Sequence, residues 1–126
     1  LFRAEALINF FSGAFALIAP ATFTSMFMPA DAPLAHAEMA RWFGAMTFAF
    51  GFVLWRALDL EWPTLKPVIE AYLLGDVLYF FALIAFASNG GAWTGASVFS
   101  TLSTILLGVA RVVCLTRPAL LYRAPG

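Results

Sequence analysis

Charge is what this sequence most lacks. Only 11% of its 126 residues are Asp, Glu, Lys or Arg, whereas a soluble domain carries about a quarter. Hydrophobic residues make up 63% and aromatic residues 17%. A chain with so little polar surface cannot cover its apolar residues in water, which indicates a lipid environment. The formal net charge is zero, so there is no electrostatic basis for binding nucleic acid.

Cysteine and catalytic motifs are scarce as well. The single cysteine, Cys114, excludes an internal disulfide and a metal site built from several cysteines. The chain contains no GxSxG, HExxH, CxxC, Walker or GxGxxG pattern, which makes an enzyme the less favoured class. The sequence begins with Leu1 rather than Met, which is compatible with a processed leader.

Long stretches without charge are what the sequence does contain. A helix needs about 20 apolar residues to cross a bilayer, and four segments meet this length. We therefore predict an all-α fold, an integral membrane four-helix bundle in one transmembrane domain over residues 1–126. Its predicted spans cover residues 6–28, 37–58, 67–87 and 94–115.

Turn and cap residues set the expected limits of these spans. Pro20 is expected to kink or end the first span early, because proline removes a backbone donor. Thr64 is the expected cap of the third span, with Pro67 in its first turn. The Ser-Asn-Gly-Gly sequence at 88–91 predicts the turn that separates the last two spans.

The distribution of Lys and Arg predicts the orientation. Four spans place both termini on one side of the membrane. Six basic residues lie on that side, and one, Arg41, lies on the other. Such an excess marks the cytoplasmic, matrix or stromal side. The six are Arg3, Arg56, Lys66, Arg111, Arg117 and Arg123.

Two carboxylates interrupt the third span. Glu70 lies near the basic side, and Asp76 lies about 14 Å deep, near the midplane. Six residues at about 100° each place them about 120° apart on the helix, which disfavours a paired acid/base site. An antiparallel fourth span brings Arg111 to the depth of Glu70, which predicts a structural ion pair. The alternative is that each side chain reaches its interface separately.

Asp76 has no cation at its expected depth. Tyr72 and Tyr79 share its helix face, and Thr104 lies at its level on the fourth span, within a small polar stripe that includes Gly108. One interpretation is a ligand-binding or proton-handling site formed by Asp76, Tyr72, Tyr79 and Thr104. The other is a neutral carboxyl that makes a packing hydrogen bond between two spans.

His36 is the only histidine. In the predicted 29–37 loop it is a weak candidate for an axial ligand of haem or chlorophyll, and a solvated loop residue is the more ordinary interpretation. No other metal site is indicated. Small residues on the first two spans, among them Gly13, Gly44 and Gly51, predict helix–helix contacts.

Two segments carry a family resemblance. ARWFGAMTFAFGFVLWRAL, at residues 40–58, has an Arg-x-x-Gly start formed by Arg41 and Gly44. LLGDVLYFFALIAF follows, with Gly75 and Asp76. Over about half its length the chain resembles the small four-span membrane proteins of the DoxX-like group, which implies the four-helix fold. It is more faintly similar in layout to emopamil-binding-type proteins, which bind sterol-like ligands.

Two classes of function remain open. The first is a non-catalytic accessory subunit of a larger respiratory or photosynthetic membrane complex, whose partners are the bilayer and other membrane subunits. The second is a binding or carrier protein for a lipophilic small molecule, centred on Asp76. On that interpretation the bound molecule is a lipid, a sterol or a pigment.

Overall fold

A computed structural model describes residues 1–27, 34–90 and 93–121, and within these ranges it contains helices and no strand. The chain divides into two compact units, Leu1–Leu58 with Thr94–Ala96 and Asp59–Trp93 with Ser97–Gly126. The first contains α1, α2 and α3, and the second contains α4, α6 and nearly all of α5. The helices are α1 (Phe2–Ile18), α2 (Pro20–Ser25), α3 (Leu34–Ala57), α4 (Trp62–Ser88), α5 (Gly95–Thr116) and α6 (Pro118–Leu121).

Proline divides the first predicted span into two helices. Ala19, the residue before Pro20, has φ −128° and ψ 60° and separates α1 from α2. The proline ring clashes with a helical conformation of the residue before it, so the helix ends there. The expected break at Pro20 is therefore confirmed. In α2 the Thr24 hydroxyl donates to the Pro20 carbonyl over 2.8 Å. Residue 28, the predicted end of the span, lies outside the described residues.

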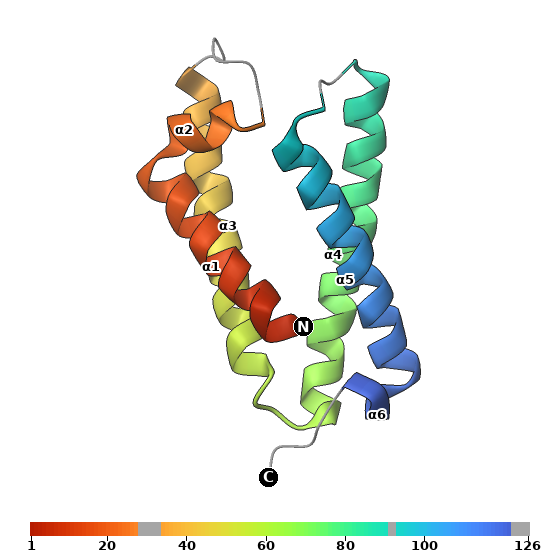
Figure 1. Ribbon diagram of the computed structural model, residues 1–126. Coiled ribbons are helices and arrows are strands. Elements are labelled where there is room, and N and C mark those ends of the chain that lie inside the picture. Colours follow the sequence, from red (N-terminus) through yellow and green to blue (C-terminus); the bar gives the residue numbers. More distant parts are fainter. Residues whose placement is uncertain (28–33, 91–92, 122–126) are drawn as a thin grey trace. The chain divides into compact units, whose positions relative to one another are not determined.

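Glycines bring the antiparallel helices α1 and α3 into close contact (Figure 1). A Cβ atom on Gly13 would lie 2.8 Å from the carbonyl oxygen of Gly44, and one on Gly44 would lie 2.8 Å from that of Gly13. A Cβ on Gly51 would lie 2.9 Å from the carbonyl oxygen of Ala6. Any larger residue would separate the two backbones, so the predicted contact role of these glycines is confirmed.

Aromatic rings hold α2 against both neighbours in the first unit. The ring of Phe23 lies 6.0 Å from that of Phe15 on α1 and 6.0 Å from that of Phe43 on α3, measured between centroids. Phe10 and Phe48 meet edge to face at 4.9 Å, beside the glycine contacts. Such pairs contribute about 0.5–1.5 kcal/mol beyond the area they bury.

In the second unit α4 begins earlier than predicted. Its N-cap is Glu61, and Pro63 occupies the first turn, where the missing N–H removes no helical hydrogen bond. The expected cap at Thr64 is therefore wrong, and Pro67 lies inside the helix. Trp62 and Pro63 can extend the helix because the first turn tolerates proline.

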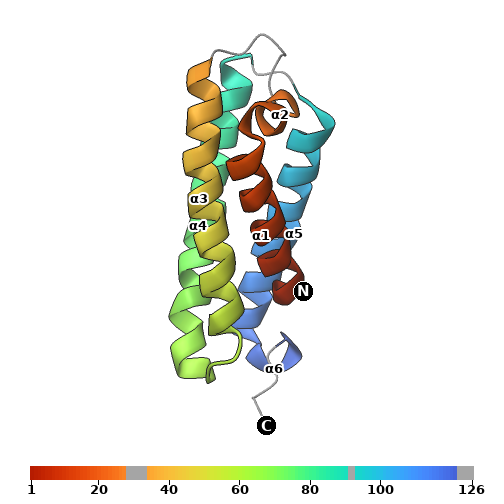
Figure 2. The ribbon, with the colours of Figure 1, turned by 90° about the vertical axis from the view of Figure 1, so that its left-hand side faces the viewer.

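Helices α4 and α5 run antiparallel (Figures 1 and 2), and α5 matches its predicted range to within one residue at each end. With 27 and 22 residues, they are about 40 Å and 33 Å long at about 1.5 Å per residue. Both are long and apolar enough to cross a membrane, and they are the two described helices that meet this criterion. α3 begins three residues before its predicted start and also ends one residue short.

Candidate functional site

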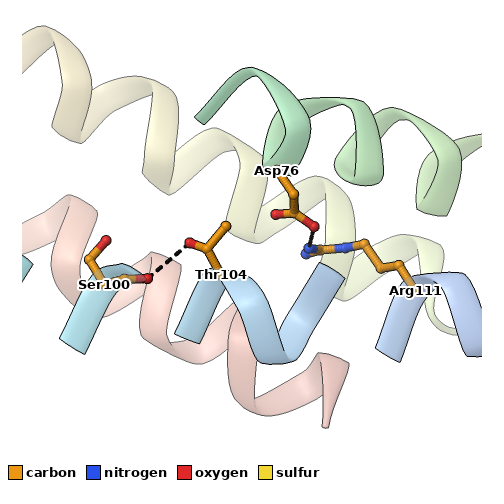
Figure 3. A network of polar contacts seen from close by, with 4 residues as sticks. All are labelled: Asp76, Ser100, Thr104 and Arg111. Atoms are coloured by element: carbon orange, nitrogen blue, oxygen red, sulfur yellow. Dashed lines mark hydrogen bonds and ion pairs between the residues drawn. The ribbon is translucent and has the colours of Figure 1, made fainter. Parts of the chain in front are cut away.

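An ion pair joins α4 to α5 within their apolar length. The guanidinium of Arg111 donates from Nη1 to Oδ2 of Asp76 (Figure 3). The Arg111 side chain is 1% exposed and that of Asp76 is 14% exposed. Asp76, for which the sequence predicts no cation at its own depth, is therefore paired with a cation whose Cα lies at a different level. Because each charge neutralises the other, the hairpin can keep both away from water at a reduced cost.

The direction of side chains on a helix explains this pairing. Every Cα–Cβ bond tilts toward the N-terminus of its own helix. In an antiparallel pair, Asp76 leans toward the start of α4 and Arg111 leans toward the start of α5, so the two approach each other. Matching the depths of Cα atoms alone places Arg111 beside Glu70, which is why sequence position suggests the wrong acid.

Tyr72 and Gly108 lie beside the pair in the second unit. The Tyr72 ring lies one turn before Asp76, and its centroid is 5.3 Å from Cζ of Arg111, in cation–π range. A Cβ atom on Gly108 would lie 3.4 Å from Oδ2 of Asp76. This is an ordinary van der Waals distance, so the Asp76 carboxylate lies directly against the Gly108 position of α5.

Glu70 has a different partner from the one predicted. Its carboxylate lies 3.7 Å from Nζ of Lys66, one turn earlier on α4, and both side chains are about half exposed. The predicted Glu70–Arg111 pair is therefore wrong. About 120° of helix rotation separates Glu70 from Asp76, so Glu70 lies on a different face from the one that meets Arg111.

Hydroxyl groups form a second polar cluster closer to the turn between α4 and α5. The Tyr79 phenol donates to the Ser100 hydroxyl over 3.2 Å and lies 3.5 Å from the Thr101 hydroxyl. Thr104 donates to the carbonyl of Ser100 on its own helix over 2.9 Å (Figure 3). The four predicted ligand residues therefore divide. Asp76 and Tyr72 surround Arg111, whereas Tyr79 and Thr104 contact Ser100.

Sequence spacing contained a signal for Arg111. The small polar stripe on α5 advances by four, three and four residues from Ser97 to Gly108, and three further residues lead to Arg111. On α4 the same alternation joins Tyr72, Asp76 and Tyr79. Extending the α5 stripe by this one step places Arg111 on the helix face that meets Asp76.

His36 lies in the first turn of α3 and not in a loop. Residues 29–33 of the predicted loop are outside the described part of the chain. Among the described residues, no group of three or more His, Cys, Asp or Glu side chains could hold a metal ion.

Comparison with protein-family models, with curated proteins and with solved structures finds no match. The contacts within the two units are therefore the observations from which a function can be argued.

Proposed function

We propose that the chain is an integral membrane protein with four spans and serves as a non-catalytic accessory subunit of a larger membrane complex, of the respiratory or photosynthetic type. The two helices that could cross a membrane, α4 and α5, support half of this arrangement. For the other half, α1 with α2 provides one proposed crossing and the 24-residue α3 provides another.

The observation that carries the proposal is the outward exposure of large apolar side chains on every long helix. Phe11 on α1 and Trp42 on α3 are each 74% exposed, Phe81 on α4 is 66% exposed, and Leu102 on α5 is 62% exposed. Leaving such side chains in water costs about 1.5–3 kcal/mol each relative to full burial. Lipid or a neighbouring membrane subunit would cover them, while the charged pair stays enclosed.

Membership of the DoxX-like group is part of this proposal. Of the residues that carry the resemblance, Gly44 packs on α1 and Asp76 holds α5 through Arg111. Both contacts suit a compact helical bundle. The proposed orientation keeps the excess of basic residues, and so both termini, on the cytoplasmic, matrix or stromal side.

The size of the protein after gentle extraction tests the accessory role. The full chain would be extracted from its native membrane in a mild detergent and sized by gel filtration with light scattering. A stable assembly several times the 13.7 kDa chain mass, with other proteins in fixed ratio, supports the proposal. A monomer or homodimer would contradict it. The same sizing in a harsher detergent is the control for non-specific association.

Binding of a lipophilic small molecule is the second candidate function. It is favoured by the half-buried hydroxyl groups of Tyr79, Ser100 and Thr101, which converge from α4 and α5 in an otherwise apolar environment. A small particle that co-purifies with a stoichiometric lipid, sterol or pigment would support this function in place of the first.

A further inference from the structure

The ion pair is poorly suited to take a ligand. Asp76 and Arg111 are paired with each other, and the Arg111 side chain is 1% exposed. A ligand there would have to break an enclosed pair and leave a buried charge without its partner, which is strongly unfavourable. The hydroxyl groups of Tyr79, Ser100 and Thr101 differ, because all three side chains are partly exposed. We call these three residues the hydroxyl cluster.

The hydrogen bonds of the hydroxyl cluster leave one donor available. Thr101 donates to the carbonyl of Ser97 on its own helix. The Tyr79 phenol donates to the Ser100 oxygen. Among the described residues, the proton of the Ser100 hydroxyl then has no acceptor, since the contacts of Ser100 are those with Tyr79 and the bond from Thr104 to its carbonyl. A hydroxyl that accepts one bond is polarised into a better donor for the next.

We propose that the hydroxyl cluster binds the oxygen-bearing headgroup of an uncharged lipophilic molecule, with the Ser100 hydroxyl donating to a carbonyl or hydroxyl oxygen of that molecule. This inference depends on the proposed membrane placement and deepens the second candidate function, moving its centre from Asp76 to Tyr79 and Ser100. The two sources of this headgroup chemistry are a quinone-type carbonyl and a sterol-type hydroxyl.

Charge and depth define the class of ligand. No Asp, Glu, Lys or Arg occurs from Val77 to Ala110, so a charged headgroup at the cluster would find no counter-ion on these segments. Ser100 lies five residues into α5, about 8 Å along its axis. This depth lies below the interface, where an uncharged headgroup can rest while its apolar body extends into the surrounding lipid.

A thermal-shift titration of the full chain in mild detergent tests the proposal. The probes are a benzoquinone with a decyl chain and cholesterol, which separate the two sources, with palmitate and sphingosine as charged comparators. A ligand that binds only the folded state stabilises it by RT ln(1 + [L]/Kd), so the melting temperature rises with ligand concentration and with affinity. We expect at least one neutral probe to raise Tm saturably and the charged comparators to leave it unchanged.

Two variants locate the site. Ser100→Ala removes the donating hydroxyl and nearly keeps the shape, so it should weaken the neutral probe about fivefold to tenfold, as expected for loss of one hydrogen bond. Tyr79→Phe removes the phenol that polarises Ser100 and should weaken the probe less. Thr116→Val is the matched control, because its hydroxyl donates to carbonyls of its own helix near the end of α5. It should bind like the unmodified protein.

Three results would overturn the inference. One is the failure of both neutral probes to shift Tm. Another is equal or tighter binding of a charged comparator. The third is unchanged affinity in Ser100→Ala, which would show that this hydroxyl does not donate to the ligand. None of these three results depends on the size of the assembly, so the proposed accessory role is tested separately by the sizing experiment.

Discussion

Asp76 and Arg111 meet between α4 and α5, although their Cα atoms lie at different levels along the hairpin. Arg111 donates to Oδ2 of Asp76, and its side chain is almost fully buried. The ion pair and the Tyr79–Ser100 hydrogen bond both connect the two apolar helices. Our hypothesis is that the charges fix the register of the two helices more than they add stability.

Removing one partner of the ion pair should therefore lower the stability of the protein substantially. Asp76→Asn or Arg111→Gln leaves a buried charge and should destabilise the protein by about 3–5 kcal/mol. The double variant should lose less than the sum of the two, with a coupling energy of about 0.5–3 kcal/mol. Thermal unfolding of the four proteins in detergent measures this cycle, and additive losses would contradict the contact.

The exposed pair on α4 provides the control for that cycle. Lys66→Gln and Glu70→Gln remove charges that are about half exposed and one helical turn apart. Solvent screens such pairs, so each change should cost less than about 1 kcal/mol. A loss as large as that at Asp76 would mean that Glu70 has the structural role that depth alone predicts.

Tyr72 should stabilise Arg111 through its ring. Tyr72→Phe keeps the aromatic face that lies 5.3 Å from Cζ of Arg111, whereas Tyr72→Leu removes it. The Leu variant should be about 0.5–2 kcal/mol less stable than the Phe variant, the range of a cation–π contact. Urea or thermal unfolding of both variants in one detergent gives the difference. Equal stability would exclude a contribution from the ring.

The first unit should be sensitive to a single methyl group. In Gly13→Ala the new Cβ would lie 2.7 Å from the backbone nitrogen of Phe48. Backbone atoms cannot turn aside, so α1 and α3 must separate, at a cost of about 1–3 kcal/mol. Gly75→Ala is the matched control, because nothing lies within 4 Å of its Cβ position. Ala at that helical site should stabilise by about 0.5–1 kcal/mol. Similar effects at both sites would contradict the close packing.

Rules that concern neighbouring residues in the sequence predicted the helices better than they predicted the contacts between helices. Pro20 ends α1 because its ring clashes with a helical conformation of the preceding residue. This rule can be applied from the sequence alone. Small-residue spacing likewise predicted the contacts of Gly13 and Gly44. To identify the partner of Arg111, the tilt of the side chains has to be considered as well as their depth. Counting residues considers depth alone and therefore selected Glu70. The start of α4 was missed because two prolines, Pro63 and Pro67, could each occupy a first turn.

Labelling from the two sides of the membrane tests most directly whether α4 crosses it, as the four-span arrangement requires. In a Cys114→Ala background, Asp59→Cys would report on the connection between α3 and α4, and Asn89→Cys on the end of α4. An impermeant maleimide added to sealed native vesicles should label Asn89→Cys from the side opposite to the one that labels Asp59→Cys. Labelling of both sites from the same side, or recovery of the chain in the aqueous phase after alkaline extraction, would contradict the account.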